Sequence, residues 1–174
     1  SIPNLNIISP ADCTETVKSI YSSLNNNSPT YIRLTGGQFN NAVYEEDYNF
    51  EIGKAIRLKK GKKIAILASG TRVFDAVSAS EKFYEENNFQ VSVYNFHTIK
   101  PIDKNTIEQI SKEHSCLLTV EEHNIIGGLG SAVAETLSEM DKKNIKLCRM
   151  GVKDFYPKGG DYNDLLKLLN LDKD

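Results

Sequence analysis

Apolar positions along the 174-residue chain form short continuous runs that alternate with segments of helical periodicity. From residue 62 onward this alternation is regular, and each run predicts a strand buried on both faces. The runs cover residues 64–68, 91–94, 116–120 and 145–150, and the helices are expected after Thr71, near Pro101, from Ser131 and over 162–169. This order predicts an α/β domain built on an open, mostly parallel twisted sheet with helices on both faces.

The first 36 residues predict a separate, smaller unit of strand, helix and strand. Residues 5–8 and 31–34 are the strand candidates, and Ser9, Pro10 and Asp12 suit the N-cap, first turn and N3 position of the helix between them. Apolar residues at helical spacing follow: Val17, Ile20, Tyr21 and Leu24. Such a unit is too small to bury its own faces, so we expect it to lean on structure outside this chain.

A connector of mixed composition separates the two parts. We therefore expect three regions, residues 1–36, 37–61 and 62–174, with a strand or hairpin arm near 50–58. The first residue is Ser1, which suggests either a piece of a longer protein or ordinary removal of an initiator Met.

The stretch from 115 to 135 is the centre of the predicted domain. Glu121, Glu122 and His123 follow the apolar run where its strand is expected to end, and the carboxyl ends of parallel strands are where ligands and partners meet such a fold. Three glycines then allow a tight turn into a helix that carries an apolar stripe. These glycines are Gly127, Gly128 and Gly130, and the stripe is Val133, Leu137 and Met140. The pattern predicts a site or an interface.

Several kinds of chemistry fit parts of this pattern only weakly. Two carboxylates and a histidine could act as acid and base, but the trio has low specificity. The glycines are similar to a dinucleotide fingerprint, except that Val133 replaces the third small residue and an acidic segment would repel a pyrophosphate. The turn at residues 69–71 could hold an anion at a helix N-terminus, although tight geometry alone explains its glycine. His97 and His114 have no metal-ligand spacing and suit surface or strand-end positions.

Composition excludes other classes of function. The chain has 21 Lys and Arg against 23 Asp and Glu, a net charge of −2, so charge gives no reason to expect nucleic acid or an anionic membrane as partner. No apolar run approaches the roughly 20 residues that span a bilayer. Cys13, Cys116 and Cys148 are widely spaced and odd in number, which favours buried free thiols and a cytoplasmic protein.

Four blocks of sequence resemble transketolases. Residues 121–135, Glu-Glu-His-Asn-Ile-Ile-Gly-Gly-Leu-Gly-Ser-Ala-Val-Ala-Glu, resemble a segment of their C-terminal domain. Residues 96–103 are similar to the family's Phe-Thr-Ile-Lys-Pro-Leu-Asp with an extra histidine, and residues 50–55 are similar to the start of that domain. Residues 10–12 and 29–33 resemble the end of the preceding pyrimidine-binding domain. The blocks keep the family's order and cover nearly the whole chain.

The resemblance implies a part of an enzyme that uses thiamine diphosphate and Mg²⁺ to transfer a two-carbon ketol unit between sugars. In that family the cofactor and metal ligands, and the glutamate that activates the cofactor, belong to regions that precede this sequence. We therefore expect no catalytic, cofactor-binding or metal-binding residue here, and no activity of the chain alone. The expected partners are a second copy and the cofactor-binding N-terminal region or subunit. Seven residues of this segment would line an interface or contact the residues that form the active site. They are Glu121, Glu122, His123, Asn124, Gly127, Gly128 and Gly130.

One departure from the family concerns the substrate. In many transketolases an arginine that binds the terminal phosphate follows the strand matching residues 31–34, and Gly36 stands at its position here. Arg33 matches a different position and is expected on the other face of the strand.

Related families keep two alternatives open. Deoxyxylulose phosphate synthases and the beta subunits of 2-oxo-acid dehydrogenases share the architecture, although their glutamate-glycine motifs normally lack the His123-Asn124 pair. A third alternative is a non-enzymatic assembly or regulatory module.

Overall fold

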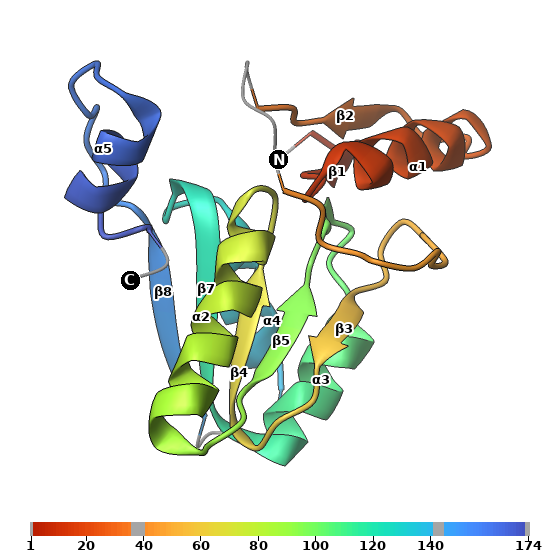
Figure 1. Ribbon diagram of the computed structural model, residues 1–174. Coiled ribbons are helices and arrows are strands. Elements are labelled where there is room, and N and C mark those ends of the chain that lie inside the picture. Colours follow the sequence, from red (N-terminus) through yellow and green to blue (C-terminus); the bar gives the residue numbers. More distant parts are fainter. Residues whose placement is uncertain (1, 36–40, 141–144, 173–174) are drawn as a thin grey trace.

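The larger of two sheets has five strands in the order β3-β5-β4-β7-β8 (Figure 1). The computed structural model describes residues 2–35, 41–140 and 145–172. The strands are β3 (Ile56–Lys59), β4 (Lys63–Ala68), β5 (Ser92–Asn95), β7 (His114–Asn124) and β8 (Lys146–Val152). All neighbours are parallel except β3, which pairs antiparallel with β5 at one edge. The connector thus supplies an edge strand of four residues, at the end of the arm expected near 50–58.

Helices cover both faces of this sheet, as the apolar pattern predicts. The helix α2 (Arg72–Asn87) lies on one face, while α3 (Lys104–Glu113) and α4 (Leu129–Ser138) lie on the other (Figure 1). Because side chains alternate along a strand, Leu67 of β4 packs with α3 and α4 whereas its neighbour Ile66 packs with α2. Continuous apolar strands are therefore needed to fill both layers of the core.

The smaller sheet joins the N-terminal unit to the rest of the chain. Its order is β2-β1-β6, formed by β2 (Thr30–Ile32), β1 (Asn6–Ile8) and β6 (Thr98–Lys100). The strands β1 and β2 are parallel and are linked by α1 (Cys13–Leu24), as expected, but β6 comes from the larger domain and runs antiparallel to β1. The unit therefore lies above the carboxyl edge of the larger sheet (Figure 1).

The helix α1 begins later than the sequence pattern suggested. Asp12 is its N-cap and not its N3 residue, because the Asp12 carboxylate accepts a hydrogen bond from Glu15 N at 2.8 Å. Glu15 takes the N3 position and reaches back to Ala11 N at 2.6 Å, so that two otherwise unpaired amides at the helix start are satisfied. Cys13 is exposed at the first turn, which corrects the expectation that all three thiols are buried; Cys116 and Cys148 are partly buried.

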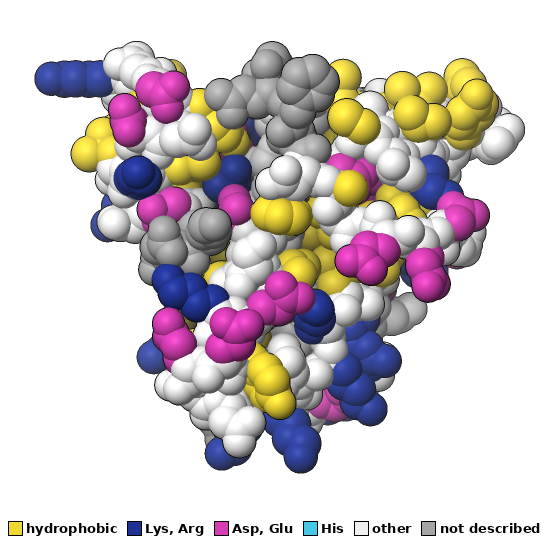
Figure 2. Space-filling view, viewed as in Figure 1, with side chains coloured by type: hydrophobic (Ala, Val, Ile, Leu, Met, Phe, Trp, Pro, Cys, Tyr) yellow, Lys and Arg dark blue, Asp and Glu magenta, His cyan; other side chains and the backbone are white. Residues whose placement is uncertain are grey.

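The apolar stripe of α1 faces away from the rest of the chain. Val17, Ile20, Tyr21 and Leu24 are 52%, 45%, 66% and 75% exposed. The side of α1 that packs inward carries the fully buried Glu15 and Ser19 instead. Hydrophobic side chains accordingly gather on the surface over this part of the molecule (Figure 2). Among the described residues, no helix has the length and apolarity required to cross a membrane.

A buried polar cluster connects α1, the connector and β5. Glu15 is 0% exposed, and its carboxylate accepts hydrogen bonds from Asn95 Nδ2 at 2.8 Å and from the Tyr44 hydroxyl at 3.3 Å. Burial raises the pKa of Glu15 from 4.5 to about 7, and the nearby Asp12 adds to the shift, against the lowering effect of the hydrogen bonds. The cluster therefore holds three segments together around a carboxyl group that resists ionisation.

The raised pKa makes stability depend on pH. Between pH 4.5 and 7 the native state keeps the Glu15 proton that the unfolded chain releases, so this contribution to the free energy of unfolding is full below pH 4.5 and is lost as pH rises through 7. We expect Glu15→Gln, a neutral isostere, to gain about 3 kcal/mol relative to wild type between pH 4.5 and 8. Urea unfolding at each pH measures the difference. Glu86→Gln, at an exposed position, is the matched control. If the difference in free energy of unfolding between Glu15→Gln and wild type changes as little with pH as it does for Glu86→Gln, the raised pKa of Glu15 is contradicted.

Candidate functional site

The central strand β7 runs four residues beyond its expected end. The sequence predicted that the strand would stop at Val120, but pairing with β8 resumes at Asn124, opposite Val152, after an irregular segment. Glu121, Glu122 and His123 therefore lie within the strand, not on a tip after it, and successive side chains point to opposite faces. This alternation separates Glu122 from Glu121 and His123.

Glu121 binds the start of α4. Its two carboxylate oxygens accept hydrogen bonds from Leu129 N at 2.7 Å and Gly130 N at 2.8 Å, and the residue is 2% exposed. The carboxylate thus satisfies two free amides and lies at the positive end of the helix dipole. Burial nevertheless raises the pKa of Glu121 above its ordinary value, because desolvation outweighs the lowering effect of the two amides.

Each glycine of the motif is constrained for a different reason, and Gly128 is the one required by the Glu121 contact. A Cβ on Gly128 would overlap Glu121 Oε2, and a Cβ on Gly130 would lie 2.9 Å from Thr119 Oγ1. Gly127 has φ +79°, a conformation that side chains disfavour. In a dinucleotide fold the pyrophosphate occupies the helix N-terminus, and here the Glu121 carboxylate occupies it. The geometry therefore excludes the dinucleotide interpretation.

Glu122 points away from Glu121 and holds the C-terminal segment. Its Oε2 atom accepts hydrogen bonds from the Thr71 and Tyr162 hydroxyls, and Arg72 Nη2 lies 3.6 Å away. Arg72 is 3% exposed and also donates to Leu171 O at 2.9 Å. This network fixes α5 (Tyr162–Leu168) beside the edge of the sheet. No sequence pattern marked Arg72 or Tyr162, because their partners are distant in the chain.

His123 and Asn124 lie at the surface of the rim. His123 is exposed, and its Nδ1 lies 2.8 Å from Asn124 O. The Asn124 side chain donates to Asp154 at 3.2 Å and accepts from Ile126 N at 2.8 Å, which shapes the turn towards α4. With both carboxylates bound to protein groups, the segment does not assemble an acid–base trio.

The other two histidines are buried, so the surface half of the expectation is wrong, while His114, the first residue of β7, does lie at a strand end. His97 is 0% exposed and stacks on Phe50 at 4.2 Å between ring centres, and burial lowers its pKa to about 4. His114 is 7% exposed and bonds Ser92 Oγ at 2.9 Å and Ile110 at 3.0 Å. Within residues 2–35, 41–140 and 145–172, no group of three His, Cys, Asp or Glu side chains could hold a metal ion.

The strand-to-helix turn at Gly70 contacts the N-terminal unit. Gly70 has φ +60°, and its amide donates to Ser9 O at 3.1 Å, while Ser69 N donates to Val120 O at 3.2 Å. These two amides are therefore committed to protein carbonyls and do not form the anion site that the turn suggested. Gly36 lies outside the described residues.

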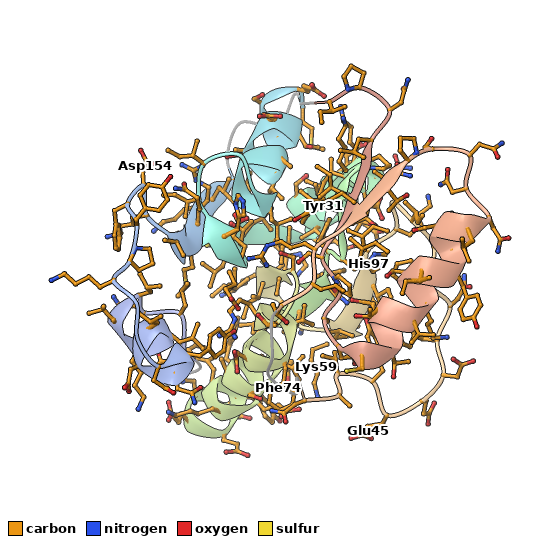
Figure 3. All side chains as sticks on the ribbon, turned by 90° about the horizontal axis from the view of Figure 1, so that it is seen from above. Tyr31, Glu45, Lys59, Phe74, His97 and Asp154 are labelled. Atoms are coloured by element: carbon orange, nitrogen blue, oxygen red, sulfur yellow. The ribbon has the colours of Figure 1, made fainter. Side chains whose placement is uncertain are left out.

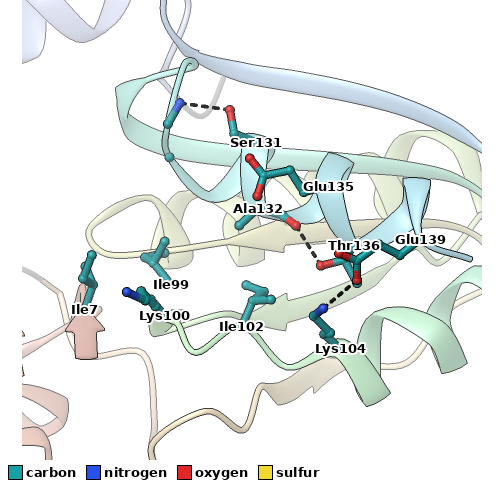
Figure 4. Close-up of a pocket in the computed structure, with 12 residues that line it drawn as sticks. Ile7, Ile99, Lys100, Ile102, Lys104, Ser131, Ala132, Glu135, Thr136 and Glu139 are labelled. Atoms are coloured by element: carbon teal, nitrogen blue, oxygen red, sulfur yellow. Dashed lines mark hydrogen bonds and ion pairs between the residues drawn. The ribbon is translucent and has the colours of Figure 1, made fainter. Parts of the chain in front are cut away.

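Two adjoining hollows lie between the N-terminal unit and the larger domain. The first is a groove of about 460 Å³ between α4 and β6, crossed by the Lys104–Glu139 ion pair at 2.6 Å (Figure 4). The second, which we call the seam cavity, measures about 220 Å³. Its lining residues are Ile7, Ser9, Tyr31, Arg33, Ser69, Ile99, Glu121, Glu122, His123, Gly127, Gly128 and Leu129. The view down on the carboxyl edge shows Tyr31 of β2 over the middle of the molecule (Figure 3).

Comparison with known proteins identifies a family. Residues 53–174 match the model described as the transketolase C-terminal domain. The chain is 37% identical to a putative transketolase C-terminal section of Methanocaldococcus jannaschii and 36% identical to one subunit of the apulose-4-phosphate transketolase of Actinobacillus succinogenes. The two alignments include 99% and 98% of this chain, but only 53% and 54% of the length of the two relatives. The chain thus spans about half the length of these relatives.

The chain is also similar to 1-deoxy-D-xylulose-5-phosphate synthases and to solved structures of transketolases. A 1-deoxy-D-xylulose-5-phosphate synthase of Halothermothrix orenii is 34% identical over 99% of the chain and 27% of that enzyme. A split-gene transketolase described as an inactive β4 tetramer superposes with a TM-score of 0.89 at 33% identity, over 99% of this chain and 54% of that one. Transketolase of Campylobacter jejuni, at 19% identity and a TM-score of 0.72, shares the fold. The expected fold class is confirmed.

The contact between Glu121 and Gly128 yields a stability prediction. Gly128→Ala displaces the carboxylate from both amides, so we expect a loss of about 2 kcal/mol in the free energy of unfolding, with a larger loss for Gly128→Arg. His123→Ala removes an exposed side chain and is expected to cost less than about 0.5 kcal/mol. Chemical denaturation measures both. Similar losses for Gly128→Ala and His123→Ala would show that the close approach does not constrain the turn.

Proposed function

Because the chain belongs to the transketolase C-terminal domain family, we propose that it is the C-terminal part of a two-part transketolase. The complete enzyme would transfer a two-carbon ketol unit between sugars. Thiamine diphosphate and Mg²⁺ would be held by the other part and would supply the carbanion chemistry. The role of this chain would be to assemble that enzyme, with residues 1–36 completing the pyrimidine-binding domain, 37–61 connecting and 62–174 forming the C-terminal domain.

The outward apolar face of α1 is the observation that carries this proposal. Tyr21 and Leu24 are 66% and 75% exposed, and Leu34, just after β2, is 61% exposed. Among the described strands, β2 pairs only with β1, so its other edge is open for hydrogen bonding. An apolar helix face beside an open strand edge needs both a packing layer and a neighbouring strand. The cofactor-binding part of the enzyme would supply both.

A second copy of the chain would meet the rim of β7. The rim carries His123 and Asn124 beside Ile126, which is 60% exposed, and a Cβ at Gly127 would meet nothing within 4 Å, so the turn is open at that point. A patch of this kind suits a two-fold contact in which it meets itself. The description of a similar split-gene transketolase as an inactive β4 tetramer supports self-assembly without activity for the isolated chain.

A deoxyxylulose phosphate synthase is the second candidate. The 34% identity to that synthase from Halothermothrix orenii is close to the 36% identity to the transketolase subunit of Actinobacillus succinogenes, so overall similarity does not separate the two activities. The two differ in what the reconstituted enzyme would make. An assay that measures both ketol transfer and 1-deoxy-D-xylulose 5-phosphate formation distinguishes them.

Reconstitution tests the proposed assembly. We expect no ketol transfer from this chain alone and transfer after it is mixed with the cofactor-binding part. The double variant Tyr21→Asp, Leu24→Asp places charge on the proposed contact and should weaken complementation by about tenfold or more. Tyr156→Asp alters a fully exposed side chain of the larger domain and serves as the control.

Two results would contradict this assignment. Full complementation by the double variant would remove the α1 face from the interface. Calorimetric titration of the chain alone with thiamine diphosphate and Mg²⁺ should give no saturable heat, and micromolar binding would show that the cofactor site does not need another part.

The substitution at residue 36 generates a prediction about substrates. A charged arginine–phosphate contact is worth roughly 1.5–3 kcal/mol, or about 10- to 150-fold in affinity. Without it, we expect the reconstituted enzyme to discriminate weakly between phosphorylated and unphosphorylated acceptors, and Gly36→Arg to increase the ratio of their kcat/KM values. If the wild type already prefers the phosphorylated sugar a hundredfold and the arginine adds nothing, the departure has no role in specificity.

A further inference from the structure

The seam cavity lies where three parts of the chain meet. The N-terminal unit contributes Ser9 and Arg33, the β4–α2 turn contributes Ser69, and the rim of β7 contributes Glu121 and Glu122. The carboxyl edge of a parallel sheet is a common position for ligands. At about 220 Å³ the cavity has room for a small molecule only.

The two carboxylates on its wall are already bound by protein groups. Glu121 accepts from the two amides at the start of α4, at 2.7 and 2.8 Å. Glu122 accepts from two hydroxyl groups, with the guanidinium of Arg72 3.6 Å away. The start of α4 thus stabilises the Glu121 carboxylate, and Arg72, which also pairs with Asp75 at 2.7 Å, lies beside the Glu122 carboxylate.

Arg33 is the cation of the cavity without a carboxylate partner. Its Nη2 donates to Glu122 O, a neutral carbonyl, at 2.9 Å, and within the described part of the chain it forms no ion pair. A guanidinium has five N–H donors, so this single bond leaves most of its capacity free. Arg33 follows β2, and its side chain reaches across the seam to the β7 rim.

Two hydroxyl groups add to this donor set. Ser9 and Ser69 are 7% and 5% exposed, and both line the cavity. Among the residues that the structure describes, neither hydroxyl has a hydrogen-bond partner, and neither is one of the fully buried side-chain atoms, so both stay accessible to a ligand. The apolar part of the lining comes from Ile7, Ile99 and Leu129. A cation and two hydroxyl donors together with apolar side chains match a small organic molecule with one anionic end.

We propose that the seam cavity binds a small metabolite through a carboxylate or phosphate group, with Arg33 as its counter-ion and Ser9 and Ser69 as hydrogen-bond donors. The carbon part of the ligand packs against Ile7, Ile99 and Leu129. The proposed ligand contacts use none of the α1 side chains that we propose join the chain to a cofactor-binding part, so the proposal does not depend on the catalytic assignment. Part of the lining, Tyr31 of β2 and the rim residues His123, Gly127 and Gly128, also belongs to surfaces proposed above for assembly. Because Arg33 belongs to the N-terminal unit and Glu122 to the larger domain, a bound anion ties the two together.

Calorimetric titration of the whole chain tests the site. The probes are inorganic phosphate and lactate, each at constant ionic strength maintained with chloride. Wild type and Arg57→Gln, which removes an exposed arginine on β3, are expected to bind at least one probe saturably in the millimolar range or tighter. Arg33→Gln is expected to weaken that binding roughly tenfold or more, and Arg33→Lys to weaken it less. The preferred probe identifies the anionic group.

The outcomes separate binding from folding. Circular dichroism checks that Arg33→Gln is folded, and if it is not, Ser69→Ala decides, with an expected several-fold loss of affinity. Saturating probe should also raise the midpoint of thermal unfolding for wild type and Arg57→Gln. The proposal is overturned if neither probe binds the wild type saturably, or if a folded Arg33→Gln, or Ser69→Ala in its place, binds as tightly as the wild type.

Discussion

The carboxylate of Glu121 at the start of α4 is the contact on which the carboxyl edge depends. A buried negative charge is costly unless it is fully hydrogen-bonded, and two amides of the helix meet that requirement. The contact forces the chain to turn within a few residues after β7, and only a glycine at position 128 leaves room for it. As a result Glu121 occupies the helix end that could have bound phosphate.

The same strand organises the parts that surround it. Glu122 binds α5 through Tyr162 and the start of α2 through Thr71, while its backbone carbonyl accepts from Arg33 of the N-terminal unit. One residue of β7 therefore contacts three segments that are 40 to 89 positions away in sequence. Parallel strands bring such segments together at one edge, which is why the hydrogen bonds that join the two sheets concentrate there.

Sequence patterns predicted the elements that depend on local chemistry. The apolar runs at residues 64–68 and 116–120 became strands because both faces of the sheet are covered, and the asparagines after Leu24 ended α1. The strand β6 was missed because its three residues form a strand only by pairing with β1. The extension of β7 was missed because charged residues favour a strand end unless distant groups bind them.

The candidate site was only partly predictable for the same reason. The motif marked residues 121–130 as important, but its role as a helix cap depends on the distance between Glu121 and the amides, which no spacing rule supplies. Arg72 and Ser9 belong to the site through contacts across the fold, which neither the sequence around Arg72 nor the helix-start pattern at Ser9 indicates. The burial of His97 and His114 was missed because it comes from packing with Phe50 and Ser92.

The outward-facing apolar side of α1 has a consequence for how the protein is produced. A chain that presents Tyr21 and Leu24 to water beside an open strand edge offers the two features that promote non-native association. Whenever synthesis exceeds the supply of whatever covers this face, the surplus is subject to aggregation and to proteolysis by quality-control systems. If the chain belongs to a two-part enzyme as proposed, balanced production of the two parts, and not folding of this chain alone, would set how much of it accumulates in the cell.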